Sequence, residues 1–278
     1  QGGIPVERLN PKCDYSDSSM THNTGDAKLF NDVFKELGLL TPPQRVNSNI
    51  RTAVDGFPID VFSAETMDGE RTYYGQYNLN NDKSDWAEVT GMKPVKAADG
   101  TLVEWECPIT LEFLNNSYAL GKFQLHGRTE AEVEAELVAG FDDALEFNYP
   151  KDLYWSEAVA AKEEGDVADD ERKTAIRRLW TWVRDCIPSD ADMSCKDLST
   201  WKSEKFRNEI AQYLDVPFVL TYYVFTDYKA LVDQRVKNMM ARTWDGKIWY
   251  ITYYDGDTAY LLRNDCFLAY LYTLSRET

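Results

Sequence analysis

The sequence predicts an α+β fold, with a β-rich N-terminal lobe over residues 1–127 and a helical C-terminal lobe over residues 128–278. In much of the first half, apolar and polar residues alternate, which is typical of half-buried strands. In the second half, apolar residues recur every three to four positions, which is typical of amphipathic helices. The 278 residues, of which 44% are hydrophobic and 13% aromatic, are enough to bury a sizeable core.

The first half contains one predicted helix, over residues 26–40. Its apolar residues follow helical spacing, and Gly38 and two prolines end the pattern. From residue 54 the period changes to two, and an Asp-Gly turn at 68–69 predicts a long hairpin that continues to residue 79. A second β region is predicted over residues 102–113.

Three helices are predicted in the second half. The first begins at a capping box formed by Thr129 and Glu132, because each side chain can satisfy a free backbone amide of the other. Its periodic pattern runs to Phe147. The other two are predicted over residues 169–187 and 199–214.

Charge and composition exclude several classes of protein. Thirty basic against 47 acidic residues give a net charge of −17, which argues against a protein that wraps nucleic acid through its overall field and leaves only a local basic cleft for such a partner. No apolar run approaches the roughly 20 residues of a membrane-spanning helix, so we expect a soluble protein without a membrane span. Five cysteines without a C-x-x-C pair argue against a disulfide scaffold and a zinc site. Cys186 and Cys195 flank a polar loop and either form a disulfide or stay reduced.

The most informative segment lies in the last quarter of the chain. An apolar helix is predicted over residues 216–231, and a polar loop follows it. A β-hairpin on an Asp-Gly turn is then predicted over residues 239–254. The hairpin returns the chain to its starting point, so residues before and after it can meet. The oxygen-bearing residues that flank it are Asp233, Asn238, Asp255 and Asp257.

The order helix, Asp-x4-Asn loop, hairpin, Asp is also that of the catalytic segment of protein kinases. Phosphoryl transfer needs hard oxygen ligands for Mg²⁺ and a carboxylate beside the attacking hydroxyl, and these residue types supply both. The pattern has other interpretations. Asp-x4-Asn is frequent by chance, and Asp-Gly-Asp also occurs in simple turns and in structural Ca²⁺ sites.

The chain resembles the spore-coat CotH kinase family, particularly the CotH-like domains encoded by tailed bacteriophages and gut bacteria. The resemblance spans nearly the whole sequence. In the C-terminal half it is carried by Asp-Gly-Lys-Ile-Trp at 245–249 and Tyr-Asp-Gly-Asp-Thr at 254–258, together with residues 222–226, 232–233 and 237–238. In the N-terminal half it is carried by residues 12–19, 22–24, 56–59, 75–79 and 145–150.

The resemblance implies a single bilobal domain with a protein-kinase-like fold that binds ATP with Mg²⁺ or Mn²⁺. It implies an atypical kinase that transfers phosphate to Ser or Thr of a structural protein. Asp233 would then be the catalytic base, and Lys12 would meet the phosphates of the nucleotide. Asn238 and Asp255 would be metal ligands, and Asp257 a second ligand or a supporting carboxylate.

The sequence departs from the family after Asp257, where residues 259–262 replace the usual aromatic-Gly turn. The second hypothesis is therefore a non-catalytic structural or adhesive module of a phage virion or cell surface that keeps the kinase-like fold. Either hypothesis is compatible with a piece of a larger chain or virion assembly. Each candidate also has a plain structural interpretation: Asp233 as a solvated helix end, Asn238 as a loop cap and Lys12 as a surface residue.

Overall fold

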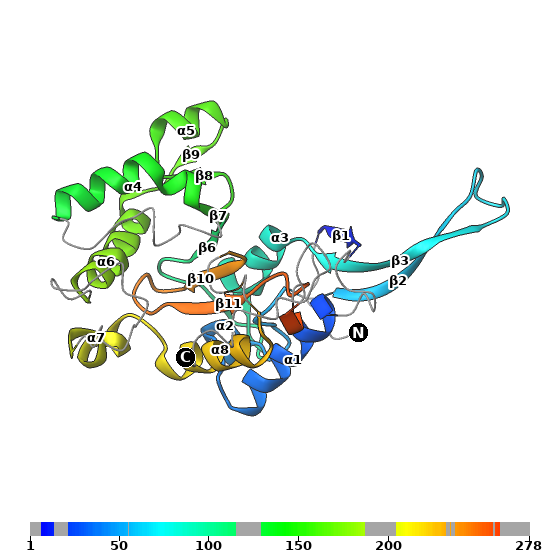
Figure 1. Cartoon of the computed structure of the whole chain (residues 1–278), viewed down its shortest axis with the longest axis horizontal. Coiled ribbons are helices and arrows are strands. Elements are labelled where there is room, and N and C mark those ends of the chain that lie inside the picture. The colour runs from blue at the N-terminus through cyan, green and yellow to red at the C-terminus, as the bar shows by residue number, and fades with distance from the viewer. Residues whose placement is uncertain are drawn as a thin grey trace, which may run out of the picture.

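The computed structural model describes residues 7–13, 22–54, 56–114, 129–186, 204–231, 234, 237–257 and 259–261. Helices and strands are interspersed, and the strands form several separate sheets, which confirms the predicted α+β class. Figure 1 shows the largest sheet near the middle of the molecule, helices around it, and a long two-stranded arm that projects from one side.

The central sheet has four antiparallel strands in the order β11-β10-β6-β7. β6 precedes the predicted lobe boundary at residues 127 and 128, whereas both of its neighbours follow it. The two predicted segments therefore share one sheet. The strands are β6 (Ile109–Phe113), β7 (Leu145–Tyr149), β10 (Met239–Thr243) and β11 (Tyr250–Tyr253).

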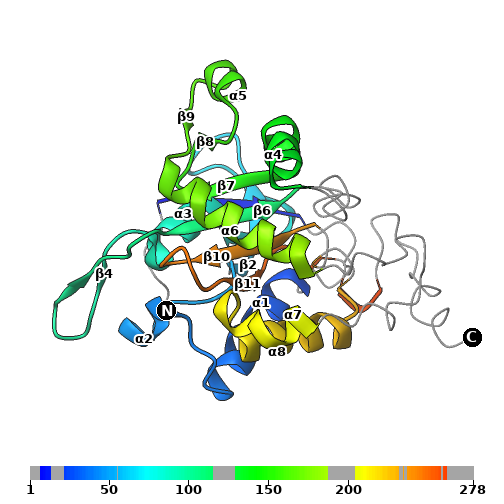
Figure 2. The same cartoon turned by 90° about the vertical axis from the view of Figure 1, so that its left-hand side faces the viewer.

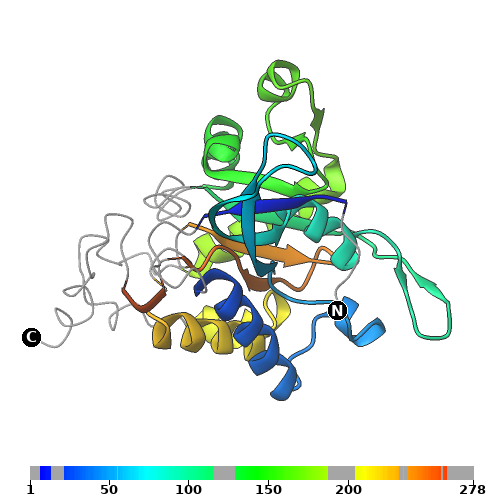
Figure 3. The ribbon, with the colours of Figure 1, turned by 90° about the vertical axis from the view of Figure 1, so that its right-hand side faces the viewer.

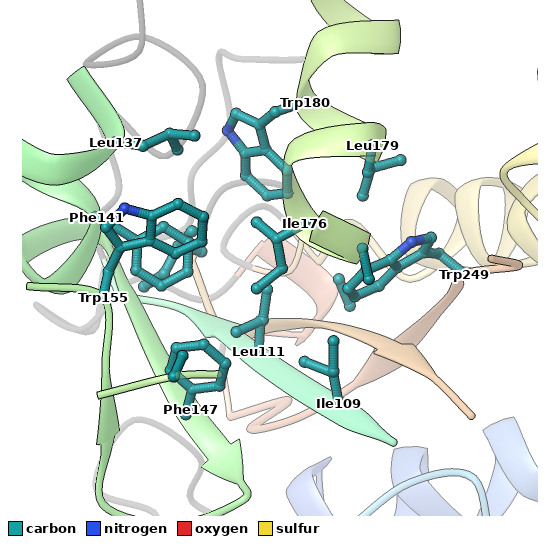
Figure 4. Close-up of a cluster of buried hydrophobic side chains, with 14 of the residues drawn as sticks. Ile109, Leu111, Leu137, Phe141, Phe147, Trp155, Ile176, Leu179, Trp180 and Trp249 are labelled. Atoms are coloured by element: carbon teal, nitrogen blue, oxygen red, sulfur yellow. The ribbon is translucent and has the colours of Figure 1, made fainter. Parts of the chain in front are cut away.

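One face of this sheet is covered by α4 (Glu130–Ala144) and α6 (Asp170–Cys186), and Figure 2 views the molecule from this side. The predicted capping box at the start of α4 is confirmed, with the Thr129 amide donating to Glu132 Oε2 at 2.7 Å. Figure 4 shows side chains of both helices meeting those of the strands in the core. The core residues labelled there are Ile109, Leu111, Leu137, Phe141, Phe147, Trp155, Ile176, Leu179, Trp180 and Trp249.

The other face is covered by α1 (His22–Glu36), α3 (Lys83–Ala87) and α8 (Val216–Tyr228). Figure 3 shows α1 and α8 side by side below the sheet. Aromatic rings join them: the Phe34 and Phe218 ring centroids lie 4.5 Å apart, and Phe30 stacks on Tyr253 of β11 at 5.7 Å. This aromatic packing fixes the two helices against the strand that leads to Asp255.

Arg242 of β10 is a buried cation on the same face of the sheet. Its guanidinium lies 4.3 Å from the ring centroid of Trp86 and 4.8 Å from that of Trp244. Its Nη2 donates to Thr90 Oγ1 at 2.9 Å. Burial lowers the pKa of Arg242 to about 9, because desolvation penalises the charged form. Two aromatic faces thus hold a charge for which the described residues provide no carboxylate.

A smaller sheet has the strand order β1-β3-β2. It consists of β1 (Leu9–Lys12), β2 (Gly56–Ser63) and β3 (Thr72–Asn81), so the predicted hairpin is confirmed. β1 pairs only with the last four residues of β3, from Asn78 to Asn81. Farther out, β2 and β3 form a two-stranded ribbon, the arm seen in Figure 1.

Two helix predictions need correction. α1 begins at His22, four residues before the predicted start, and ends at Glu36. The helix predicted to reach Phe147 ends at Ala144, because the next five residues pair with β6 as strand β7. In β7 the buried Leu145 and Phe147 alternate with the partly exposed Glu146, which is the period of a strand.

The helix predicted over residues 199–214 is also shorter than expected. In the described part of that range, α7 covers only Glu204–Glu209, and a 3-10 turn follows at Ile210–Gln212. The predicted hairpin over residues 239–254 and the helix over residues 169–187 are confirmed by β10, β11 and α6.

The remaining elements are short. Among the described residues, no helix is both long enough and apolar enough to cross a membrane. Cys186 is buried at the end of α6, whereas Cys195 lies outside the described residues, so their disulfide stays a prediction. The short elements are α2 (Pro42–Val46), a π-helical turn (Glu88–Met92), β4 (Val95–Lys96), β5 (Leu102–Val103), β8 (Leu153–Tyr154), α5 (Glu157–Lys162), β9 (Asp166–Val167) and a 3-10 turn (Ala259–Leu261).

Candidate functional site

The β10–β11 hairpin determines where two of the candidate residues lie. Met239 pairs with Tyr253, so Asn238 and Asp255 lie just outside the paired strands, at the same end of the hairpin. The Asp-Gly turn lies at the opposite end, where Asp245 Oδ1 accepts the backbone amides of Lys247 and Ile248. The predicted direction of the hairpin is confirmed.

Lys12 lies at this end of the hairpin, although 243 positions separate it from Asp255. Its Nζ lies 3.5 Å from Asp255 Oδ1 and donates to the Tyr254 hydroxyl at 3.1 Å. Lys12 and Asp255, to which the resemblance assigns phosphate and metal binding, are thus in direct contact, and no phosphate fits between Nζ and Oδ1 in this arrangement. Burial lowers the pKa of Lys12, but Asp255 and Tyr254 outweigh it and the net pKa is raised. Lys12 is therefore a charged ammonium at neutral pH.

Asn23, which the sequence analysis did not single out, holds Asp255 from the other side. Its Nδ2 donates to Asp255 Oδ1 at 2.8 Å, and its Oδ1 accepts the Gly256 amide at 3.4 Å. Asp255 Oδ1 thus receives both donors, while Oδ2 accepts no hydrogen bond from the described residues. The signal was present in the resemblance at residues 22–24. Only the contact between the first turn of α1 and the hairpin shows its meaning.

Gln234 connects the loop after α8 to the same point. Its side chain is fully buried, and its Nε2 donates to the backbone carbonyls of Tyr254, at 3.1 Å, and Asp255. The Tyr222 hydroxyl donates to the carbonyl of Gln234 at 2.5 Å. Asp233, the predicted base, lies outside the described residues.

A buried ion pair lies behind the turn that carries Asp255. Lys229, which caps the C-terminus of α8, has its Nζ 2.8 Å from Asp26 Oδ1 of α1, and both side chains are 5% exposed. The Lys229 ammonium also donates to the Tyr260 hydroxyl, and the Lys229 carbonyl accepts the Tyr260 amide at 2.7 Å. Burial lowers the pKa of Lys229, but the bonds to Asp26 and Tyr260 outweigh it, so the net pKa is raised.

Tyr253 fills the space between this ion pair and the turn. Its side chain is wholly buried, and its hydroxyl has no hydrogen-bond partner among the described residues. Burial raises the pKa of Tyr253 well above the usual value, and the nearby carboxylates of Asp26 and Asp255 raise it further. The phenol is therefore neutral at physiological pH, and its bulk limits which residues fit at position 256.

Gly256→Ala is expected to destabilise the protein, because a Cβ at this position would lie 1.4 Å from the Tyr253 hydroxyl oxygen and 2.5 Å from its Cζ. The buried ring cannot move aside freely, so we expect a loss of about 1–3 kcal/mol or more. Urea unfolding monitored by fluorescence measures this loss in the free energy of unfolding.

Gly140→Ala in α4 is the control, because nothing lies within 4 Å of the added methyl group. It should stabilise the helix by about 0.5–1 kcal/mol, and equal midpoints for the two variants would refute the packing argument.

A second cluster of charges lies on β6 and β7, at the β7 edge of the central sheet. Lys83 Nζ donates to Glu112 Oε2 at 2.6 Å and to Glu146 Oε2 at 2.8 Å, and Asn148 Nδ2 donates to the same Glu112 oxygen at 2.8 Å. Burial lowers the pKa of Lys83, but the two carboxylates outweigh this effect, so the net pKa is strongly raised. Glu112 contributes to the raised pKa of Tyr254, so this cluster belongs to the surroundings of the Lys12 contact.

The fold brings the predicted metal ligands Asn238, Asp255 and Asp257 to the same end of the hairpin. Asn238 is 7% exposed, its amide donates to the Phe113 carbonyl at 3.2 Å, and both Asn238 and Asp255 have left-handed backbone with φ of 54° and 56°. No described residue forms a hydrogen bond with the Asn238 side chain. Asp257 is partly exposed and close enough to Tyr253 to raise its pKa. Within the described ranges, no group of three or more His, Cys, Asp or Glu could hold a metal ion.

Comparison with known proteins does not assign the chain to a family. The chain matches no model of a known protein family, and a search of curated proteins finds no similar sequence.

Proposed function

We propose that this chain is a CotH-like atypical kinase that transfers phosphate from ATP to Ser or Thr of a structural protein. The observation that carries the proposal is the contact between Lys12 and Asp255. A cation from an N-terminal strand and a carboxylate after the C-terminal hairpin lie 3.5 Å apart, which brings a group suited to phosphate and a group suited to a metal ion to one place.

The chemistry of the donors fits a nucleotide with its metal ion. Lys12 supplies a charged ammonium for phosphate oxygens, and Asp255 retains one carboxylate oxygen that no described residue bonds. Asn238 adds a buried amide oxygen at the same end of the hairpin, and Asp257 a further carboxylate. Hard oxygen ligands of this kind suit Mg²⁺ or Mn²⁺, and a bound ion would neutralise charge on the transferred phosphoryl group.

Asp233 is assigned as the group that orients the acceptor hydroxyl and accepts its proton. This assignment rests on the resemblance, and the next residue, Gln234, donates to the backbone carbonyls of Tyr254 and Asp255. Asn23 is assigned a positioning role, since it holds the Asp255 carboxylate and the following amide together. The bilobal kinase-like fold is part of the same proposal.

The non-catalytic module remains the second candidate because of one observation. Asp255 Oδ1 already receives donors from Lys12 and Asn23, and such a bonded cluster can also serve only to tie β1 and α1 to the hairpin. Nucleotide binding separates the two functions.

Adding ATP with Mg²⁺ at millimolar concentration is expected to raise the melting temperature by about 2–5 °C, because a ligand that binds only the folded state stabilises it. Differential scanning fluorimetry measures the shift. ATP with EDTA should give a smaller one. Lys12→Met should reduce the shift, whereas Lys96→Met, an exposed lysine of β4, should leave it unchanged. Absence of any shift with Mg²⁺ or Mn²⁺ would favour the non-catalytic module.

A further inference from the structure

The aromatic arm, which we define as residues 56–81, exposes large apolar side chains that nothing in the described structure covers. Phe62, Tyr73 and Tyr74 are 53%, 56% and 68% exposed, and Met67 near the tip is 93% exposed. Figure 1 shows this ribbon projecting well beyond the body of the molecule. A two-stranded ribbon without a covered face is only marginally stable in water, so a surface of this kind indicates a binding partner.

The rings of the arm are arranged in pairs. The Phe62 and Tyr73 centroids lie 5.4 Å apart, and Tyr74 stacks against Tyr77 at 6.1 Å. A shift in register between Val61 and Phe62 leaves Tyr74 without a partner in the strand ladder, next to the Phe62–Tyr73 pair. The rings thus support one another on the surface and present faces that a flat or cationic group can cover.

The charge of the arm selects the chemistry of that partner. Among residues 56–81 the only basic side chain is Arg71, and the acidic ones are all exposed. With a net charge of −17 for the chain, two copies would repel each other at this surface. A guanidinium group both stacks on aromatic faces and pairs with carboxylates, so an arginine-containing segment matches the arm. The acidic residues are Asp60, Glu65, Asp68 and Glu70.

The base of the arm adjoins the candidate site. Lys12 of β1 pairs with Asn78 of β3, and Lys12 contacts Asp255. From Tyr73 to Asn78 the strand spans about 17 Å at roughly 3.4 Å per residue. An extended segment along the arm would therefore lead toward Lys12 and Asp255 within about five to eight residues.

We propose that the aromatic arm docks an arginine-containing segment of the protein that receives the phosphate, with the reacting Ser or Thr about five to eight residues from the arginines. This inference rests on the proposed function, because it specifies the substrate of that site. Arginines stack on the exposed rings and pair with the acidic side chains, while the following residues extend to the base of the arm.

The test uses the full chain and a fluorescein-labelled peptide in which four arginines alternate with glycine, followed by a six-residue Gly-Ala linker and one serine. A matched peptide carries neutral citrulline at the four arginine positions. Binding is measured by fluorescence anisotropy at about 0.15 M salt, where long-range attraction is largely screened. The aromatic variant combines Phe62→Ser, Tyr73→Ser and Tyr74→Ser. The acidic variant combines Glu65→Gln, Asp68→Asn and Glu70→Gln.

Two control variants change the same properties elsewhere. Leu220→Ser with Val224→Ser removes exposed apolar side chains from α8, and Asp32→Asn with Glu36→Gln and Glu157→Gln removes three exposed charges from helices. We expect each arm variant to weaken binding of the arginine peptide by about ten-fold or more, and each control to change it less than about two-fold. The citrulline peptide should bind at least about ten-fold more weakly to the unmodified chain.

Several results would overturn the docking proposal. They are equal binding of the two peptides, equal losses in arm and control variants, or no binding of the arginine peptide. Light scattering that shows a dimer dissociated by the aromatic variant would instead assign the arm to a second copy of the chain. Arm-dependent peptide binding without a shift by ATP and Mg²⁺ would support docking and count against the kinase proposal alone. A shift by ATP and Mg²⁺ without peptide binding would support the kinase proposal and count against docking alone.

Discussion

Asp233→Asn is expected to reduce phosphoryl transfer by about 100- to 10,000-fold, the usual contribution of a positioned general base. The amide that replaces the carboxylate differs by one atom and cannot accept the hydroxyl proton. The fold should persist, because Gln234 still bonds the Tyr254 and Asp255 carbonyls. Transfer of radiolabelled phosphate from ATP to the chain itself or to a serine-containing protein measures the loss.

Two further variants show whether that loss is specific. Asp166→Asn, an exposed residue of β9, should leave phosphoryl transfer unchanged. Asp255→Ala should remove the dependence of nucleotide binding on Mg²⁺, whereas Asp233→Asn should retain it. If Asp233→Asn unfolds the chain or leaves phosphoryl transfer intact, the role assigned to this residue is wrong.

Lys229→Met is expected to have the largest effect on stability, a loss of about 3–5 kcal/mol. The substitution leaves the Asp26 carboxylate buried without its cation, at 5% exposure. It also removes the bond to the Tyr260 hydroxyl, which holds the chain after the Asp255 turn against the end of α8. Urea unfolding measures the change, and the nucleotide-induced shift in melting temperature should also decrease as the turn loosens.

The double variant Lys229→Met/Asp26→Leu is the control, because removing both charges avoids an unpaired ion in the core. It should be more stable than Lys229→Met alone, and equal stabilities would contradict a buried-charge origin of the loss.

The same pair predicts a dependence on pH. The pKa of Lys229 is raised in the folded state, so its stabilisation is complete below the unfolded pKa of about 10.4 and is lost as pH rises through the folded value. The unmodified chain should therefore lose more stability than the double variant as pH rises above about 10.

Local patterns in the sequence were sufficient to predict several elements. The Asp-Gly turn and the alternation around it predicted the β10–β11 hairpin, because two strands joined by a tight turn can pair in few ways. The capping box at Thr129 predicted the start of α4 for a similar reason, since both of its hydrogen bonds form within four residues. The end of α4 could not be predicted in this way. Residues 145–149 form a strand only because β6 lies beside them.

The candidate site shows the same division. The sequence by itself determined that Asn238 and Asp255 flank one hairpin. The tertiary structure alone decided that Lys12 and Asn23 converge on one oxygen of Asp255, and that Lys229 pairs with Asp26. These partners are remote in sequence and carry no shared periodicity. Their meeting depends on how β1, α1 and α8 pack around the end of the central sheet, which is a property of the whole core rather than of any segment.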